Sequence, residues 1–265
     1  MPTIAAFFDW DGTLSVDGVH LPPENRTALE QLQQAGHRVF LCTGRAPGFI
    51  PMEARTFPFD GMVAAAGGYV RLGETQLIRR VIDPDVVSRT ISYFLGTGQS
   101  CVLEGEQCNF VVNDKGYEWT DWPRLRSAAN FFHFFPGQAI SKLTVRGQLD
   151  SETTAFLSPL YTLIIHDTYV EALPIGAGKA AGMRRILEEL HLPQDNCWGF
   201  GDSFNDLDML RYAGVGVVMG NAPETVQAAG DLITDTADHA GVAKAIQYLL
   251  SPAGQQPIQK GTRIL

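Results

Sequence analysis

The chain has 265 residues, of which 45% are hydrophobic, and its mean hydropathy is close to zero. This length is enough for a folded core and a second module. The net charge of −9 and the sequence pI near 5.1 argue against the basic surface that nucleic-acid binding normally requires. No stretch of the sequence reaches membrane-spanning length, so we expect neither nucleic acid nor membrane as a partner.

The N-terminal segment is typical of a buried strand that ends in acidic residues. Residues 4–8 form a short apolar run, and Asp9 and Asp11 follow it, just before the turn-forming Gly12. No basic region precedes the run, which favours a core strand over a secretory signal peptide. The four cysteines form no Cys-x-x-Cys pair, which favours free thiols. We therefore expect a cytoplasmic protein.

Helices and strands then alternate along the chain. Pro22-Pro23-Glu24 begins a helix, and residues 37–42 have the pattern of a second strand that leads into Thr43-Gly44-Arg45. A third strand is expected over residues 61–66, followed by a polar hairpin over 71–80. This alternation predicts an α/β fold whose core is a doubly wound parallel sheet.

The pattern changes near residue 83 to that of an inserted α+β module. The expected elements are helices over 86–95 and 151–157 and strands over 100–103, 109–112, 140–145, 161–166 and 169–173. We assign residues 83–174 to a cap with an open-faced sheet that covers the site, and residues 1–82 and 175–265 to the core.

Two segments outside these elements are harder to interpret. The aromatic stretch Phe131 to Phe135 is typical of a core or a partner surface, and its apolar character would suit a dimer contact. The sequence therefore leaves monomer and homodimer open. Residues 251–265 are expected to form a loosely held tail.

A second acidic cluster follows an apolar run near the C-terminus, where Gly201-Asp202 leads to Asn205-Asp206. Parallel strands end at one edge of a sheet, where open α/β folds bind ligands, so these carboxylates are expected to converge with Asp9 and Asp11. An isolated Asp-x-Asp-Gly is often only a turn, but the two clusters together are far more specific. Oxygen ligands of this kind suit Mg²⁺ and phosphoryl transfer.

These motifs resemble those of haloacid-dehalogenase-superfamily phosphatases of the Cof type (subfamily IIB), in which the cap is inserted between the second and third motifs. The resemblance spans nearly the whole chain. It implies that Asp9 is the nucleophile and Asp11 the general acid and base. It also implies Mg²⁺ as the cofactor, with Asp9, Asp11 and Asp202 as the metal residues.

The resemblance also implies roles for residues around the transferring phosphate. Lys179 occupies the position of the third-motif lysine, which orients Asp9 and the phosphate, and Asp206 is expected to support the metal site and Lys179. Arg45 is equally suited to contacting substrate or to pairing with a surface acid. The expected phosphate- and substrate-binding residues are Thr43, Gly44, Arg45, Lys179 and Asn205.

Two positions depart from the family pattern. Trp10 stands where the family usually carries Leu, Ile or Met, and we expect its side chain to point away from the metal. Ala66-Gly67-Gly68 replaces the common Asn-Gly-Ala, which removes an amide that would contact substrate or a neighbouring group. Neither departure removes a reactive side chain.

The predicted function is Mg²⁺-dependent hydrolysis of small phosphate monoesters, sugar phosphates first, through an aspartyl-phosphate. The alternatives are a phosphomutase and a non-catalytic phosphosugar-binding regulator. A dinucleotide oxidoreductase is disfavoured because the glycines around Lys179 fit neither nucleotide loop. Substrate selectivity is expected from His166, Asp167 and Tyr169 in the cap hairpin, where a merely solvated turn is the competing interpretation.

Overall fold

The computed structural model describes residues 2–118, 120–254 and 256–264, and the chain divides into two compact units. The first unit, the core, comprises the chain up to Gly44, Ile50–Ile78 and the chain from Gly178 onward. The second unit comprises Arg45–Phe49 and Arg79–Ala177. The inserted unit thus begins at Arg79 instead of residue 83 and ends at Ala177 instead of residue 174.

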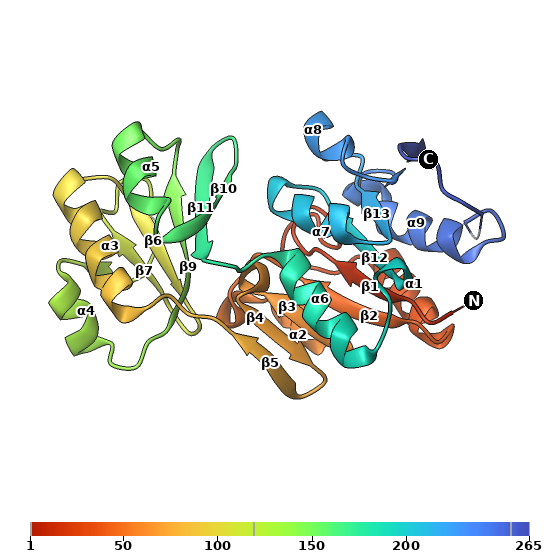
Figure 1. The fold of residues 1–265 in the computed structure, drawn as a ribbon, viewed down its shortest axis with the longest axis horizontal. Coiled ribbons are helices and arrows are strands. Elements are labelled where there is room, and N and C mark those ends of the chain that lie inside the picture. Colours follow the sequence, from red (N-terminus) through yellow and green to blue (C-terminus); the bar gives the residue numbers. More distant parts are fainter. Residues whose placement is uncertain (1, 119, 255, 265) are drawn as a thin grey trace. The chain divides into compact units, whose positions relative to one another are not determined.

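The core contains a sheet of nine strands within the described residues, in the order β15-β14-β13-β12-β1-β2-β3-β4-β5 (Figure 1). The parallel strands are β1 (Ala5–Phe8), β2 (Arg38–Cys42), β3 (Gly61–Ala64), β12 (Cys197–Gly201), β13 (Val215–Val218), β14 (Leu232–Ile233) and β15 (Thr262–Arg263). A hairpin of β4 (Tyr69–Leu72) and β5 (Thr75–Arg79) extends one edge, with β4 antiparallel to β3. The predicted α/β fold with a doubly wound parallel sheet is confirmed.

The central strands are apolar throughout because both faces of the sheet are covered. On β1, Ala6 and Phe8 pack on one face and Ala5 and Phe7 on the other. Helices α1 (Pro23–Gln34) and α9 (Gly241–Leu250) supply side chains to the first face, and α6 (Lys179–Leu190) and α7 (Leu207–Tyr212) to the second. Such two-sided burial explains why these strands show continuous hydrophobic runs instead of alternation.

The C-terminal segment is held more firmly than predicted. Thr262–Arg263 pairs with β14, because Ile264 and Ile258 pack against the core and bring the chain to the sheet edge. The prediction of a loosely held tail was therefore wrong for the part of the tail that the structure describes.

Shorter elements connect the layers of the core. They are α2 (Met52–Thr56), α8 (Glu224–Gln227), η1 (Pro47–Phe49), η2 (Ala65–Gly67), η3 (Gln194–Asn196), η4 (Phe204–Asp206) and η5 (Ala237–His239).

The second unit has its own sheet, in the order β10-β11-β9-β6-β7-β8, with helices α3, α4 and α5 packed on one face. Its helix α3 begins where the side chain of Asp83 caps the first turn and ends at the left-handed Gly98. The elements are α3 (Pro84–Thr97), β6 (Cys101–Gly105), β7 (Asn109–Val112), β8 (Arg124–Leu125), α4 (Ala128–Phe134), β9 (Ile140–Arg146), α5 (Ser151–Leu157), β10 (Tyr161–Ile165) and β11 (Tyr169–Pro174).

The aromatic stretch largely forms helix α4, which Ser127 caps by accepting a hydrogen bond from the Asn130 amide. Phe131 is 1% exposed and packs into the core of the second unit, whereas Phe132 and Phe134 are 40% and 65% exposed. The helical period therefore divides the stretch between a buried and an exposed face.

Candidate active site

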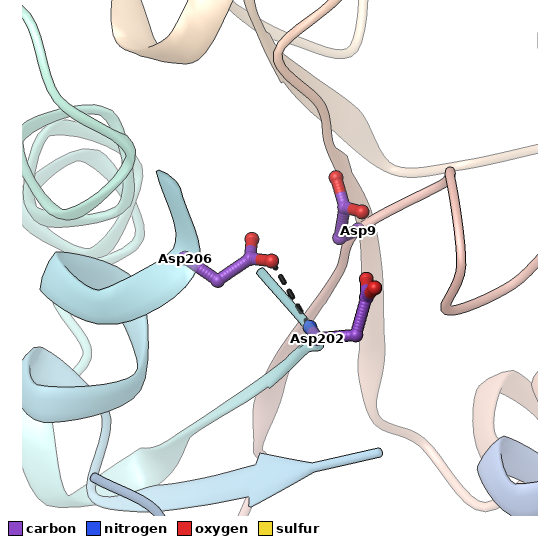
Figure 2. Close-up of side chains that lie close together, drawn as sticks. All are labelled: Asp9, Asp202 and Asp206. Atoms are coloured by element: carbon purple, nitrogen blue, oxygen red, sulfur yellow. Dashed lines mark hydrogen bonds between the residues drawn. The ribbon is translucent and has the colours of Figure 1, made fainter. Parts of the chain in front are cut away.

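The two acidic clusters meet because β1 and β12 are adjacent parallel strands that end at the same edge. The Asp9 amide donates a hydrogen bond to the Phe200 carbonyl over 2.9 Å, which places Asp9 beside the start of the second cluster. Ligand atoms of Asp9, Asp202 and Asp206 all lie within 4.8 Å of one another. Figure 2 shows the three side chains close together at the ends of β1 and β12. This convergence is the arrangement that the strand ends predict.

Lys179, the first residue of α6, links two of these carboxylates. Its Nζ donates to Asp9 Oδ1 over 2.7 Å and to Asp206 Oδ1 over 2.5 Å. Burial by itself would lower the pKa of Lys179, but the Asp206 and Asp9 carboxylates outweigh burial and raise the pKa well above its usual range. The ammonium group therefore remains charged at all physiological pH values.

Asp206 is fully occupied by groups of the protein. Besides the bond from Lys179, its Oδ2 accepts the backbone N–H groups of Asp202 and Ser203, each over 3.0 Å (Figure 2 shows the first of these). The carboxylate thus fixes both the lysine and the loop that carries Asp202. Asp9 and Asp202 are consequently better placed than Asp206 to ligate a metal ion.

The site groups three acidic side chains around one lysine. Burial raises the pKa of Asp9 well above its usual value, and Asp206 and Asp202 add to the effect. Burial and the charge of Asp206 also raise the pKa of Asp202, to about 7. Lys179 supplies one positive charge against these three carboxylates. A divalent cation with a preference for oxygen ligands would offset the remainder, so the residues present fit Mg²⁺.

The turn after β1 separates Asp11 from the other carboxylates. Gly12 is left-handed (φ +75°), and a Cβ atom there would lie 2.4 Å from Asp202 Oδ2. The backbone conformation and the lack of space for a side chain therefore both require glycine at this position. Thr13 Oγ1 donates to Asp202 Oδ1 over 2.9 Å. Of the three predicted metal residues, Asp11 is exposed and lies outside the converging group. Its charge nevertheless contributes to the raised pKa of Asp202.

Trp10 does not enter the site. Its side chain is completely buried in the hydrophobic core, and its Nε1 donates to the Gly18 carbonyl over 2.9 Å. The expectation that Trp10 points away from the metal residues agrees with this packing.

The loop after β3 contacts the backbone of Thr43 and of Gly178, the residue before Lys179. Ala65, Ala66 and Gly67 are all left-handed, with φ of 48°, 46° and 91°. The Ala66 amide donates to the Thr43 carbonyl over 3.1 Å, and a Cβ atom on Gly67 would lie 2.0 Å from the Gly178 carbonyl oxygen. The departure Ala66-Gly67-Gly68 thus places an alanine where the backbone favours Asn or Gly.

Three further residues that the sequence predicts for the site are Asn205, Thr43 and Arg45. Asn205 Oδ1 accepts from Ser203 Oγ over 2.8 Å, in the same loop as Asp202. Thr43 is buried at the end of β2, directly before Gly44. Arg45 belongs to the second unit, where its guanidinium donates to the Phe49 carbonyl over 3.3 Å.

One supporting residue was missed from the sequence. Asp208 is an exposed residue of α7, and its Oδ2 accepts the Ala180 amide over 3.0 Å in the first turn of α6. It therefore caps the helix that begins at Lys179, where Gly178 provides no side-chain cap. The signal available in the sequence was that α6 begins after glycine and so needs a cap from elsewhere.

The hairpin of β10 and β11 uses two of its three predicted specificity residues for internal packing. His166 is 6% exposed, its Nε2 lies 3.2 Å from Glu171 Oε2, and its ring stacks on Tyr169 at 4.1 Å between centroids. Glu171 also pairs with the buried Lys142. Asp167 lies exposed at the turn, and Tyr169 is half-buried.

Comparison with known proteins assigns the chain to a family. Residues 6–246 match the family model of haloacid dehalogenase-like hydrolases. The chain belongs to this family, and it is a phosphatase of the Cof type, subclass IIB. Within the described residues, no helix is long and apolar enough to cross a membrane.

Individual relatives resemble the chain along most of its length. The phosphatase YwpJ of Bacillus subtilis is 40% identical, with 91% of this chain and 98% of YwpJ covered. The 5-amino-6-(5-phospho-D-ribitylamino)uracil phosphatase YcsE of the same organism is 28% identical, with 91% and 93% covered. The solved structure of the subclass IIB sugar phosphatase BT4131 is 26% identical and superposes with a TM-score of 0.79, covering 93% of this chain and 99% of that one.

Proposed function

We propose that this phosphatase hydrolyses small phosphate monoesters, sugar phosphates first, through an aspartyl-phosphate on Asp9 and with Mg²⁺ as cofactor. The observation that carries the proposal is the position of the Asp9 carboxylate, which is buried at a strand end, bonded to Lys179 and within 4.8 Å of Asp202. The sugar phosphatase named among the similar structures supports the substrate class.

In the proposed first step, one Asp9 oxygen attacks the phosphorus atom. The bond between phosphorus and the substrate oxygen breaks, and Asp11 donates a proton to the departing alcohol. In the second step Asp11 accepts a proton from water, whose oxygen attacks phosphorus. The bond between phosphorus and Asp9 then breaks, which releases inorganic phosphate and restores the carboxylate.

Residues around Asp9 would compensate the charge of the phosphoryl group. Lys179 provides a fixed ammonium group, and Thr43 and the Gly44 amide would donate hydrogen bonds to phosphate oxygens. Asp9 and Asp202 would hold Mg²⁺, which when bound neutralises charge between the attacking carboxylate and the phosphate. Asn205 and Asp206 would keep these groups in place.

The test is a phosphate-release assay over a panel of sugar phosphates and other phosphorylated metabolites, with and without Mg²⁺. We expect release of inorganic phosphate with Mg²⁺, loss of activity in excess EDTA and recovery when Mg²⁺ is restored. Ca²⁺ should substitute poorly because it prefers longer and more numerous bonds to oxygen. Transfer of phosphate to a second sugar position without release would show a phosphomutase, and full activity in chelator would contradict the proposed site.

A further inference from the structure

We propose that Asn221 is a positioning residue that holds Asp202 and the turn after Asp9 in the arrangement that binds the metal ion. The inference rests on the proposed function. Asn221 lies in the loop after β13, and its Nδ2 donates to the Gly12 carbonyl over 3.0 Å and to Asp202 Oδ2 over 3.4 Å. One amide thus bridges both acidic clusters.

The orientation of this amide follows from its partners. Asn221 Oδ1 accepts the backbone N–H of Ala237 over 2.9 Å, and a backbone N–H can only donate. Gly12 contributes a carbonyl, which can only accept. The two NH protons of Asn221 therefore point toward Gly12 and Asp202, and no flipped arrangement satisfies these groups.

The bridge completes the support of the Asp202 carboxylate. Thr13 donates to Asp202 Oδ1 over 2.9 Å, so a neutral donor contacts each carboxylate oxygen. A neutral amide fixes the carboxylate without adding charge to a site that already holds three acidic groups and one lysine. Groups that orient a metal ligand in this way typically change metal affinity by 10-fold or more when removed.

A matched control variant tests whether the loop around Asn221 has only a structural role. Gln227 Nε2 donates to the carbonyls of Gly220 and Ala222 over 3.2 and 2.9 Å, so it holds the residues on either side of Asn221. Neither bond reaches Gly12 or Asp202. Gln227→Ala therefore loosens the loop without removing the bridge. Because Asn221 is exposed, its replacement creates no core cavity.

The experiment compares the full-length wild type, Asn221→Ala and Gln227→Ala after metal removal. Calorimetric titration with Mg²⁺ alone should show affinity about 10-fold weaker in Asn221→Ala and unchanged in Gln227→Ala. The melting temperatures without metal should stay close to wild type. Unchanged Mg²⁺ affinity in Asn221→Ala, or an equal loss in Gln227→Ala, would overturn the proposal.

A second variant separates the bridge from the attachment to Ala237. Asn221→Asp keeps the acceptor for the Ala237 amide but cannot donate to Gly12 or Asp202. Because Asp202 and the turn are then no longer held in place, this variant and Asn221→Ala should both show a lower kcat even at saturating Mg²⁺. Wild-type kcat in this variant would contradict the bridge. If the wild type released no phosphate but Asn221→Ala still lost Mg²⁺ affinity, the proposed function would fail while the positioning role of Asn221 would stand.

Discussion

Lys179 and Asp9 show how single residues define the chemistry of this site. Both are almost completely buried, and each makes the burial of the other tolerable by forming a charged hydrogen bond. Asp206 shares the same ammonium group. Removal of the lysine would leave the carboxylates without a cation, so Asp9 is the more informative residue to replace.

We predict that Asp9→Asn abolishes phosphate release, by on the order of 10⁴-fold or more, because the amide keeps the shape of the side chain but cannot act as a nucleophile. The fold should remain intact, because Lys179 still pairs with Asp206 and the amide keeps the size of the carboxylate. Phosphate release and thermal unfolding measure the two effects. Wild-type turnover in a pure preparation of this variant would refute the covalent step.

At the scale of elements, the site depends on loops that approach one another more closely than most side chains allow. The loop η2 combines left-handed residues with a close contact between Gly67 and the Gly178 carbonyl, directly before Lys179. Such strained segments persist where the surrounding structure determines them.

We predict that Gly67→Ala destabilises the protein by more than about 2 kcal/mol and lowers phosphatase activity, because the new methyl group would displace the backbone before Lys179. Gly73→Ala is the matched control, since Gly73 is also left-handed (φ +51°) but has open space around its Cβ position. It should cost about 1 kcal/mol and leave activity unchanged. Urea denaturation and phosphate release test both, and equal effects would exclude the contact as the cause.

The sheet of the second unit contains a buried cluster in which Lys142 pairs with Glu104 and Glu171, and His166 contacts Glu171. Burial alone would raise the pKa of Glu171, but Lys142 and His166 outweigh burial and hold the pKa well below its usual range. The ionised pair therefore stabilises the fold above the ordinary glutamate pKa, and this stabilisation decreases as the pH falls below it.

We predict that Glu171→Gln costs about 3 kcal/mol at pH 7 and that the difference from wild type shrinks as the pH falls below about 4.3. Below that value the unfolded wild type gains a proton that the folded protein excludes, which costs it up to about 1.4 kcal/mol per pH unit. Urea denaturation between pH 7 and pH 3 measures the trend. Asp167→Asn, an exposed change in the same hairpin, should have no effect, and a constant difference for Glu171→Gln would contradict the assignment.

At the scale of the whole molecule, we propose different roles for the two units. The core supplies Asp9, Thr43, Gly44, Lys179 and Asp202, the residues proposed to contact the phosphoryl group and the metal ion. These groups contact little of the alcohol part of a substrate, so discrimination among sugar phosphates must come from other residues. The proposal remains that the hairpin of β10 and β11 provides it.

We predict that Asp167→Ala and Tyr169→Phe change the ranking among sugar phosphates, because both alter polar groups at the hairpin turn. Hydrolysis of a small aryl phosphate should stay within about tenfold of wild type, or about 1.4 kcal/mol of barrier. His166 is less suitable for this test because it also contacts Glu171. If both activities fell together with an unchanged ranking, the hairpin would be structural.

The sequence by itself determined the architecture and the core of the site. Apolar runs over β1 and β12, each followed by aspartates, predict parallel strands that end at one edge, and this rule brings Asp9 and Asp202 together without further information. The hairpins and the helix over 151–157 were equally predictable, because turn residues and hydrophobic periodicity are local signals.

Only the tertiary structure decided which groups hold the reactive residues in place. The bond from Asn221 to Gly12 joins residues 209 positions apart, and the cap that Asp208 provides for α6 comes from another helix. The amide of the left-handed Ala66 likewise bonds to the carbonyl of Thr43, at the end of another strand. The periodicity of apolar residues along a helix or strand indicates which of its faces is buried. The direction of a polar side chain in a loop depends instead on partners that are distant in the sequence and reach it only in the folded chain.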